Sequence, residues 1–292
     1  MPARLSRRRF HQGAAVAAAG VAFGVRPAAA AEPHWPTYPR MMQRYFEAKF
    51  GPHARRIKEE LAAVDLPEAA AAHAADVRKR LAKSFGPKPE RTPLNAKVVR
   101  TLDRDGYRIE ALTYESRPGL LVTANLYLPD ATPENPGPFP GVLGVCGHAG
   151  LGKAQPAYQA FGVELAKAGF ATLIIDPIGQ GERYQWPVGM PATGAGRSLY
   201  GGPVGEHNQL DRLMRPTGQW FGTWRSWDGV RGIDYLEQRE DVSTEPFLGV
   251  TGNSGGGTMT CLLAAWDERI TAAASSCFVT TLSRNLRNEL PA

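Results

Sequence analysis

The chain has 292 residues, of which 43% are hydrophobic, and its formal net charge is +6. This composition excludes a disordered chain and suffices for one large globular domain with a small appendage. Five positive charges precede Glu32 with no acidic residue among them: Arg4, Arg7, Arg8, Arg9 and Arg26. Subtracting these five from +6 leaves +1, so the rest of the chain lacks the charge excess of a nucleic-acid-binding protein.

Residues 1–31 have the features of an export signal. A basic start precedes the apolar run GAAVAAAGVAFGV at 13–25 and small residues at 28–31, and the run is too short to span a bilayer. SRRRF at 6–10 resembles a twin-arginine signal. An ordinary secretory signal is the alternative. We expect export by the twin-arginine translocase, to the periplasm or the medium.

Residues 32–95 are expected to form a helical N-terminal extension. Apolar side chains recur there at steps of three and four residues, which is the spacing of one helix face. We expect these stripes to belong to a core: Met42, Tyr45 or Phe46, Phe50, Ile57, Leu61, Val77, Leu81 and Phe85. The proline-rich segment GPKPERTP at 86–93 should end the helices.

Residues 96–292 are expected to form one α/β domain. Strands at 97–102, 107–114 and 120–128 should be consecutive and antiparallel, because the turn sequence DRDG separates the first two. Apolar strands and helices then alternate, with strands at 141–145, 171–175, 247–250 and 270–275 and helices around 158–165, 220–236 and 259–266. This alternation predicts a mostly parallel, doubly wound sheet, with functional residues at the carboxyl ends of its strands.

One stretch carries a candidate nucleophile: FLGVTGNSGGGTM, residues 247–259. Gly-x-Ser-x-Gly at 252–256 lies between an expected strand and an expected helix, which is the context of a nucleophile elbow. In such an elbow Ser254 occupies a strained turn, and the two glycines let the strand and the helix pass close together. A serine that only caps the helix is the alternative. The flanking elements favour the nucleophile.

The chain resembles the α/β-hydrolases, in the branch of acetyl xylan esterases, cephalosporin deacetylases and dienelactone-hydrolase-like proteins. Besides the elbow, three stretches carry the resemblance: GVLGVCGHAG at 141–150, LAKAGFATLIIDPIGQGER at 165–183 and WDGVRGIDYLEQREDV at 227–242. It implies an α/β-hydrolase fold and an exported serine hydrolase that cleaves carboxylic esters, such as carbohydrate acetyl esters, through an acyl-enzyme.

The resemblance also implies roles for residues around the elbow. The oxyanion donors would be the backbone N–H groups of Gly255 and of either His148 or Ala149. His148 could be the catalytic base, but in this fold the loop histidine normally organises the backbone, so structural support is favoured. Asp176 is expected to bond nearby N–H groups, and Arg183 to be its partner or to face solvent.

The acid and the base of a triad are not found after the serine. α/β-Hydrolases order them as Ser, then Asp or Glu, then His, whereas Asp267, Glu268 and Glu289 follow Ser254 and no histidine does. We expect a hydrolase that lacks its last strands and continues beyond Ala292. The strand at 270–275 would then be an exposed edge, and the 292-residue chain poorly soluble and inactive.

Two other functions are open. A prolyl-oligopeptidase-like peptidase would share the fold and the elbow, but the extension is too short for the propeller that usually precedes such domains. A non-catalytic exported binding protein is the other alternative, because the histidine is missing.

The segment at 184–219 is rich in glycine and proline and follows the carboxyl end of a strand. Its Tyr184, Trp186 and Tyr200 would either stack on a sugar or aryl substrate or cover the core.

No metal or cofactor is expected, because no metal-ligand spacing occurs. Cys146, Cys261 and Cys277 are expected to be buried, inert thiols.

Overall fold

The computed structural model describes residues 38–189, 198–281 and 284–285. The chain divides into two compact units, residues 1–50 and 51–292. The export signal expected at 1–31 lies outside the described residues. Among the described helices, none has both the length and the apolar character needed to cross a membrane.

Two helices form where the periodicity predicts them: α2 (Met41–Ala62) and α3 (Pro67–Phe85). The stripe of α2 is not core, however, because α2 has no buried residue and Met42 and Tyr45 are more than half exposed. Periodicity identifies the residues that share a helix face, but not whether another element covers that face. At the end of α3 the prediction is right, since Phe85 is buried and stacks on Trp266.

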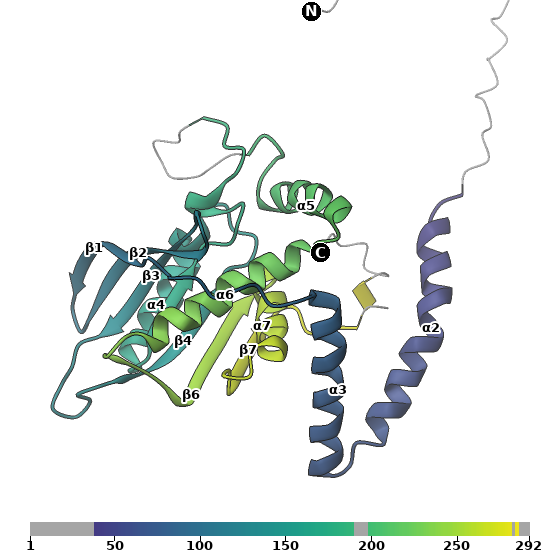
Figure 1. Cartoon of the computed structure of the whole chain (residues 1–292), viewed down its shortest axis with the longest axis horizontal. Coiled ribbons are helices and arrows are strands. Elements are labelled where there is room, and N and C mark those ends of the chain that lie inside the picture. Colours follow the sequence, from purple (N-terminus) through teal and green to yellow (C-terminus); the bar gives the residue numbers. More distant parts are fainter. Residues whose placement is uncertain (1–37, 190–197, 282–283, 286–292) are drawn as a thin grey trace, which may run out of the picture. The chain divides into compact units, whose positions relative to one another are not determined.

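A seven-stranded mixed sheet forms the centre of the second unit (Figure 1). Its strands are β1 (Lys97–Arg104), β2 (Tyr107–Arg117), β3 (Leu120–Pro129), β4 (Phe139–Val145), β5 (Ala171–Ile175), β6 (Val242–Asn253) and β7 (Ala272–Ser276). They lie in the order β1-β2-β3-β5-β4-β6-β7. β1, β2 and β3 pair antiparallel, β3 pairs antiparallel with β5, and β5, β4, β6 and β7 are parallel. The expected fold class is confirmed.

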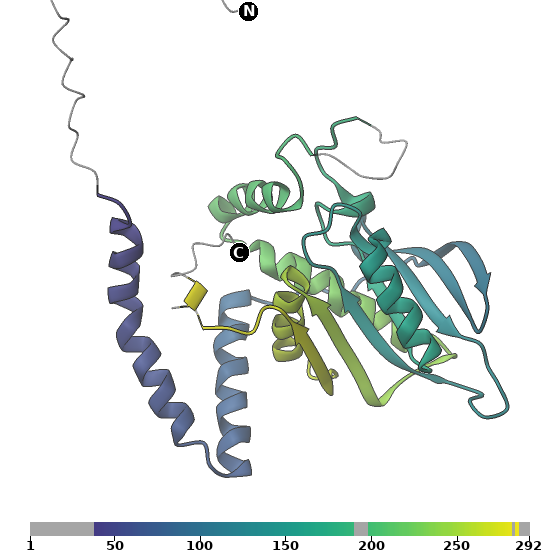
Figure 2. The same cartoon turned by 180° about the vertical axis from the view of Figure 1, so that it is seen from behind.

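Helices cover both faces of this sheet. α4 (Pro156–Lys167) packs on one face, and α6 (Phe221–Glu237) and α7 (Gly255–Trp266) pack on the other, as opposite views show (Figures 1 and 2). Along β5, Leu173 joins the cluster that contains Trp227 of α6, whereas Ile174 joins the cluster on the α4 side. Both faces of a central parallel strand are therefore buried. This explains why the sequences of the central parallel strands are continuous apolar runs.

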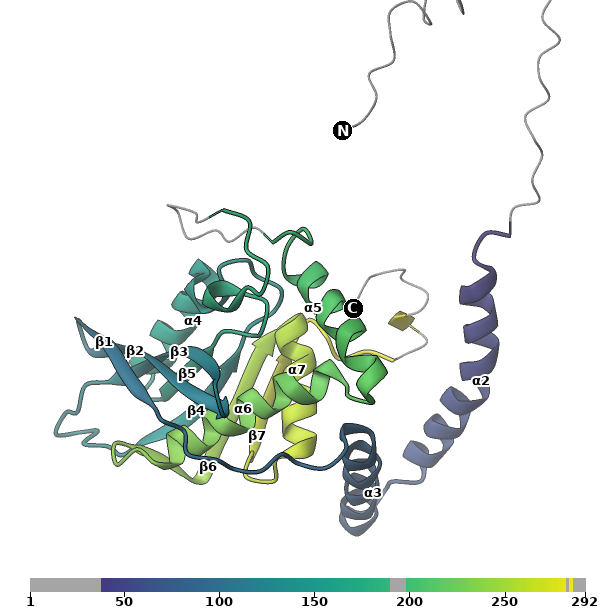
Figure 3. The same ribbon diagram turned by 45° about the horizontal axis from the view of Figure 1, so that its top comes forward.

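The segment between β5 and α6 contains a helix that the sequence did not lead us to expect. α5 (Pro203–Met214) begins after two glycines, with a proline in its first turn. It contacts the loop after β5, where a Cβ on Gly179 would come within 2.9 Å of the Cβ of Glu206. Figure 3 shows α5 next to α6. Part of the segment that was expected to be a loop is thus a helix packed over the end of the sheet.

Strand β7 is an edge of the described sheet, where we expected its edge. It pairs with β6, and its residues are exposed or half-buried. Cys277, directly after it, is exposed, so the prediction of a buried thiol is wrong at this position. Cys261 is half-buried, Cys146 is buried as predicted, and all three are free.

Candidate active site

Ser254 lies in a strained turn between β6 and α7. β6 ends at Asn253, α7 begins at Gly255, and Ser254 has φ 56° and ψ −119°. A side chain rarely adopts this backbone conformation, which costs about 1–3 kcal/mol and occurs mainly at functional sites. A hydrogen bond from the N–H of Ser254 to the carbonyl oxygen of Ser276, 2.9 Å long, ties the turn to the end of β7.

The two flanking glycines are required by close backbone contacts. A Cβ on Gly252 would come within 2.3 Å of the carbonyl oxygen of Val145, and a Cβ on Gly256 within 2.1 Å of the same atom. Real Cβ atoms essentially never approach that closely. The expectation that both glycines allow strand and helix to pass close together is therefore confirmed.

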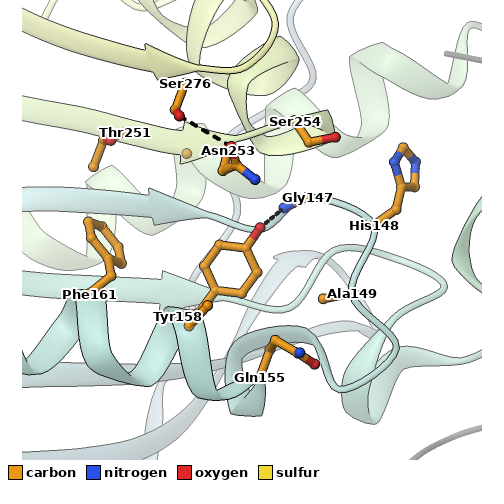
Figure 4. Close-up of a pocket in the computed structure, with 12 residues that line it drawn as sticks. Gly147, His148, Ala149, Gln155, Tyr158, Phe161, Thr251, Asn253, Ser254 and Ser276 are labelled. Atoms are coloured by element: carbon orange, nitrogen blue, oxygen red, sulfur yellow. Dashed lines mark hydrogen bonds between the residues drawn. The ribbon is translucent and has the colours of Figure 1, made fainter.

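The hydroxyl of Ser254 is available for chemistry. The side chain is exposed and makes no capping hydrogen bond to α7, contrary to the helix-cap alternative. Its Oγ has no hydrogen-bond partner within the described part of the chain. Figure 4 shows Oγ directed to the side of the pocket on which the imidazole of His148 lies.

Two backbone N–H groups near Ser254 could donate hydrogen bonds to an oxyanion. Those of Gly255 and His148 have no hydrogen-bond partner among the residues that the structure describes. The N–H of Ala149, in contrast, donates to the carbonyl oxygen of Gly147 at 2.7 Å. Of the two loop candidates, the geometry favours His148. The Gly255 N–H also lies at the amino terminus of α7, where the helix dipole favours negative charge.

A pocket of about 550 Å³ opens beside the serine, within the range of small-molecule sites. Its lining comprises Gly147, His148, Ala149, Gln155, Ala157, Tyr158, Phe161, Thr251, Gly252, Asn253, Ser254 and Ser276. One of these residues, Tyr158, lies in the helix that the sequence predicts around 158–165. Its hydroxyl accepts a hydrogen bond from the N–H of Gly147 at 2.5 Å (Figure 4), which fixes the loop after β4.

A second histidine contacts His148. Nε2 of His148 lies 3.0 Å from Nδ1 of His207, on α5, and Nε2 of His207 lies 2.8 Å from the carbonyl oxygen of Ile178.

Burial, with a smaller contribution from the charge of Arg225, lowers the pKa of His148 to about 4. The same two causes and His148 itself lower the pKa of His207 to about 2. Both rings are therefore neutral at neutral pH. From the sequence, His207 is named only beside His148 as an alternative catalytic base, should the chain prove active as it stands. Nothing local predicts that the two rings, 59 positions apart, meet.

Asp176 and Arg183 form hydrogen bonds that join the segments next to the pocket. The carboxylate of Asp176 accepts hydrogen bonds from the N–H and Nζ of Lys153 and from the hydroxyl of Thr123, so it bonds nearby donors as predicted. Arg183 is buried and does not face solvent. Its Nη1 donates to the carbonyl oxygen of Asp176 at 2.9 Å and to Asp228 at 2.7 Å. Arg183 thus joins the loop after β5 to α6.

The segment at 184–219, called the insertion below, holds three aromatic residues that do not line the pocket. Trp186 and Tyr200 form a T-shaped pair with ring centroids 5.1 Å apart, and neither they nor Tyr184 is among the pocket residues. The aromatic side chains that line the pocket are instead Tyr158 and Phe161 of α4. The described structure thus gives the insertion's aromatics a packing contact rather than a place in the pocket.

Neither Asp267 nor Glu268, the described carboxylates after Ser254, approaches it. Asp267 follows α7 and pairs with Arg269 at 2.6 Å, and Glu268 is exposed beside it. Glu289 lies outside the described residues. Within the described ranges, no group of three or more His, Cys, Asp or Glu side chains could hold a metal ion.

Comparisons with known proteins agree with this fold. No protein-family model matches the chain. Putative hydrolase YtaP of Bacillus subtilis (strain 168) is 27% identical over 213 residues, which are 70% of this chain and 64% of that protein. Methylesterase BT1017 is 26% identical with a TM-score of 0.54, over 72% of this chain and 42% of that one. A putative acetyl xylan esterase from Bacteroides fragilis NCTC 9343 is 18% identical with a TM-score of 0.53, over 70% and 53%.

The chain therefore spans less than two thirds of the length of these relatives. The mixed sheet, the helices on both faces and the solved neighbours together identify the α/β-hydrolase fold.

Proposed function

From this α/β-hydrolase fold, we propose that the protein is a serine esterase in which Ser254 is the nucleophile. The observation that carries the proposal is the strained turn at Ser254, with its free hydroxyl at the mouth of a pocket. A backbone strain of this kind persists only where the surrounding structure enforces it. Here the close passage of Gly252 and Gly256 past Val145 enforces it.

The reaction proceeds in two steps. Oγ of Ser254 loses its proton to a base and bonds to the ester carbonyl carbon, and the carbonyl oxygen becomes an oxyanion that accepts hydrogen bonds from the N–H groups of Gly255 and His148. The C–O bond to the alcohol then breaks, and the alcohol leaves with a proton. Water attacks the acyl-enzyme, releases the carboxylic acid and regenerates Ser254.

Carbohydrate esters are the proposed substrates. One solved neighbour is named a methylesterase and another an acetyl xylan esterase, and both names denote cleavage of an ester. The pocket combines aromatic surface from Tyr158 and Phe161 with the polar side chains of Thr251, Asn253 and Ser276. Such a lining suits a small acyl group joined to a hydroxylated alcohol.

A labelling experiment with matched variants tests the nucleophile. In the full-length protein, a fluorophosphonate should modify Ser254, and Ser254→Ala should lose both this label and at least about 10³-fold in kcat on aryl and sugar acetates, with KM little changed. Ser276→Ala, a hydroxyl deletion in the same pocket, is the control and should keep the label. Persistent turnover by Ser254→Ala, or a loss confined to KM, would refute the proposal.

A further inference from the structure

The contact between His148 and His207 links the candidate oxyanion loop to the insertion. His148 belongs to the loop after β4, and His207 belongs to α5, which follows β5. The two imidazoles share a hydrogen bond of 3.0 Å, and a second bond of 2.8 Å joins His207 to the carbonyl oxygen of Ile178. The pair therefore connects three segments that meet at the carboxyl ends of the strands.

The carbonyl of Ile178 fixes the tautomer of both rings. A carbonyl oxygen can only accept, so Nε2 of His207 must carry a hydrogen. In the neutral ring Nδ1 of His207 is then an acceptor, and Nε2 of His148 must donate to it. Both nitrogens of His207 and one of His148 are thus accounted for. The remaining nitrogen, Nδ1 of His148, carries a lone pair and no hydrogen.

This free Nδ1 faces the residue next to the nucleophile. A Cβ on Gly255 would come within 2.8 Å of both Nδ1 and Cε1 of His148. Figure 4 places the ring of His148 on the side to which the hydroxyl of Ser254 points. The backbone N–H of His148 belongs to the same residue, so anything that fixes the ring also limits the position of that N–H.

We propose that His207 is a positioning residue for ester cleavage: it holds His148 so that the backbone N–H and the lone pair on Nδ1 both face Ser254. This inference rests on the proposed esterase function. His148 then offers a donor to the developing oxyanion and an acceptor to the hydroxyl of Ser254. The acceptor would lose its direction if the ring could turn, and the loop that carries the donor would lose its tie to α5.

The pair does not have the properties of a catalytic base with its orienting acid. When a histidine base takes the serine proton it becomes an imidazolium, and a neighbouring carboxylate usually stabilises that positive charge. Here the chain of hydrogen bonds ends on a backbone carbonyl, and the nearby charge is that of Arg225, which disfavours a second positive charge. Positioning is therefore the role that the contacts support.

Contacts within the described part of the insertion, and with α6, fix the position of His207. Glu206, the preceding residue, is fully buried, and its carboxylate accepts hydrogen bonds from the N–H groups of Gln185 and Trp186. The ring of His207 packs against that of Phe221, with centroids 5.1 Å apart. This anchoring gives the insertion a function in the site although its aromatic residues do not line the pocket.

Variants of His207 test the inference through kcat and KM. Replacing it with Leu removes the acceptor, and we expect kcat on an aryl acetate to fall about 10²-fold while KM changes little, as for a small misplacement of reacting groups. His207→Asn places Oδ1 near the position of Nδ1, so it should recover at least about tenfold of that loss. Asn208→Leu, at an exposed position of the same helix, should match wild type.

The tautomer is measured directly and without substrate. In histidine-labelled wild-type protein at neutral pH, two-bond 1H–15N spectra should give His148 and His207 as Nε2–H tautomers. A hydrogen on Nδ1 of either ring would overturn the inference, as would full kcat in His207→Leu or an Asn variant no better than Leu. If the full-length protein neither cleaves esters nor takes the phosphonate label, the proposed function fails, and the spectra still decide whether His207 orients His148.

Discussion

The carbonyl oxygen of Val145 occupies the space that a side chain on Gly256 would need. A Cβ at this position would come within 2.1 Å of that oxygen and 3.0 Å of the N of Gly147. Val145 ends β4 and Gly256 lies in the first turn of α7. The contact therefore sets how closely the turn at Ser254 approaches the loop that carries His148, the proposed second oxyanion donor.

Replacing Gly256 with Ala should disrupt this contact. Because the obstructing atoms are backbone, they cannot move aside as the end of a flexible side chain could, and we expect a loss of about 3 kcal/mol or more in the free energy of unfolding. Urea denaturation measures it. Gly51→Ala in α2 is the control, since its nearest neighbour would be a side-chain atom at 3.7 Å. An unchanged urea midpoint in Gly256→Ala would contradict the argument.

The elbow and the sheet could be predicted because their signals are local. Two glycines at fixed distances from Ser254 indicate the turn, and continuous apolar runs indicate strands buried on both faces. The antiparallel start of the sheet follows from a short turn between two strands. In each case the residues that determine the structure are neighbours in the sequence.

The rest depends on contacts between distant residues. Nothing near His207 indicates that its ring meets His148, and nothing in the periodicity of α2 indicates that its apolar face stays uncovered. The preference for His148 over Ala149 as the proposed donor likewise required the bond from the Ala149 N–H to the carbonyl oxygen of Gly147. Tertiary packing decides such features, and a single sequence does not record it.

The N-terminal segment leads to a prediction about export. If the twin-arginine translocase carries the precursor, changing Arg7 and Arg8 together to Lys should leave it in the cytoplasm, because the translocase recognises the paired arginines. Cell fractionation followed by immunoblotting measures the outcome. Changing Arg4 to Lys is the control, since it lies outside the pair. Normal export of the double variant would favour an ordinary secretory signal.

The buried carboxylate of Glu206 should be essential for the order of the insertion. It accepts hydrogen bonds from the N–H groups of Gln185 and Trp186, at 2.9 and 3.1 Å, and from the hydroxyl of Ser198. Glu206→Ala would leave these donors without partners, at a cost of about 3 kcal/mol in unfolding free energy by urea denaturation. Glu240→Ala, at an exposed position, is the control and should leave the midpoint unchanged. Equal midpoints for both variants would show that the carboxylate is dispensable.

The stability of the protein should fall as the pH falls below about 6.5. Burial is the main cause that lowers the pKa of His207 to about 2 in the folded protein, against 6.5 as its ordinary value. Between these values the unfolded chain binds a proton that the folded protein does not bind. The free energy of unfolding therefore rises with pH in this window, by about 1.4 kcal/mol per pH unit for one proton, and the contribution is complete above the ordinary pKa.

A comparison of two variants isolates this contribution from that of the carboxylates. His207→Asn removes the titrating ring, so its unfolding free energy, measured by urea denaturation between pH 6 and 4.5, should have the smaller slope against pH. His53→Asn removes a histidine from an exposed position of α2, and its slope should stay parallel to that of wild type. Identical slopes for His207→Asn and wild type would mean that His207 takes up its proton in the folded protein as readily as in the unfolded chain. Burial beside Phe221 and Arg225 would then not hold the ring neutral, and the hydrogen-bonded pair with His148 would not persist in solution.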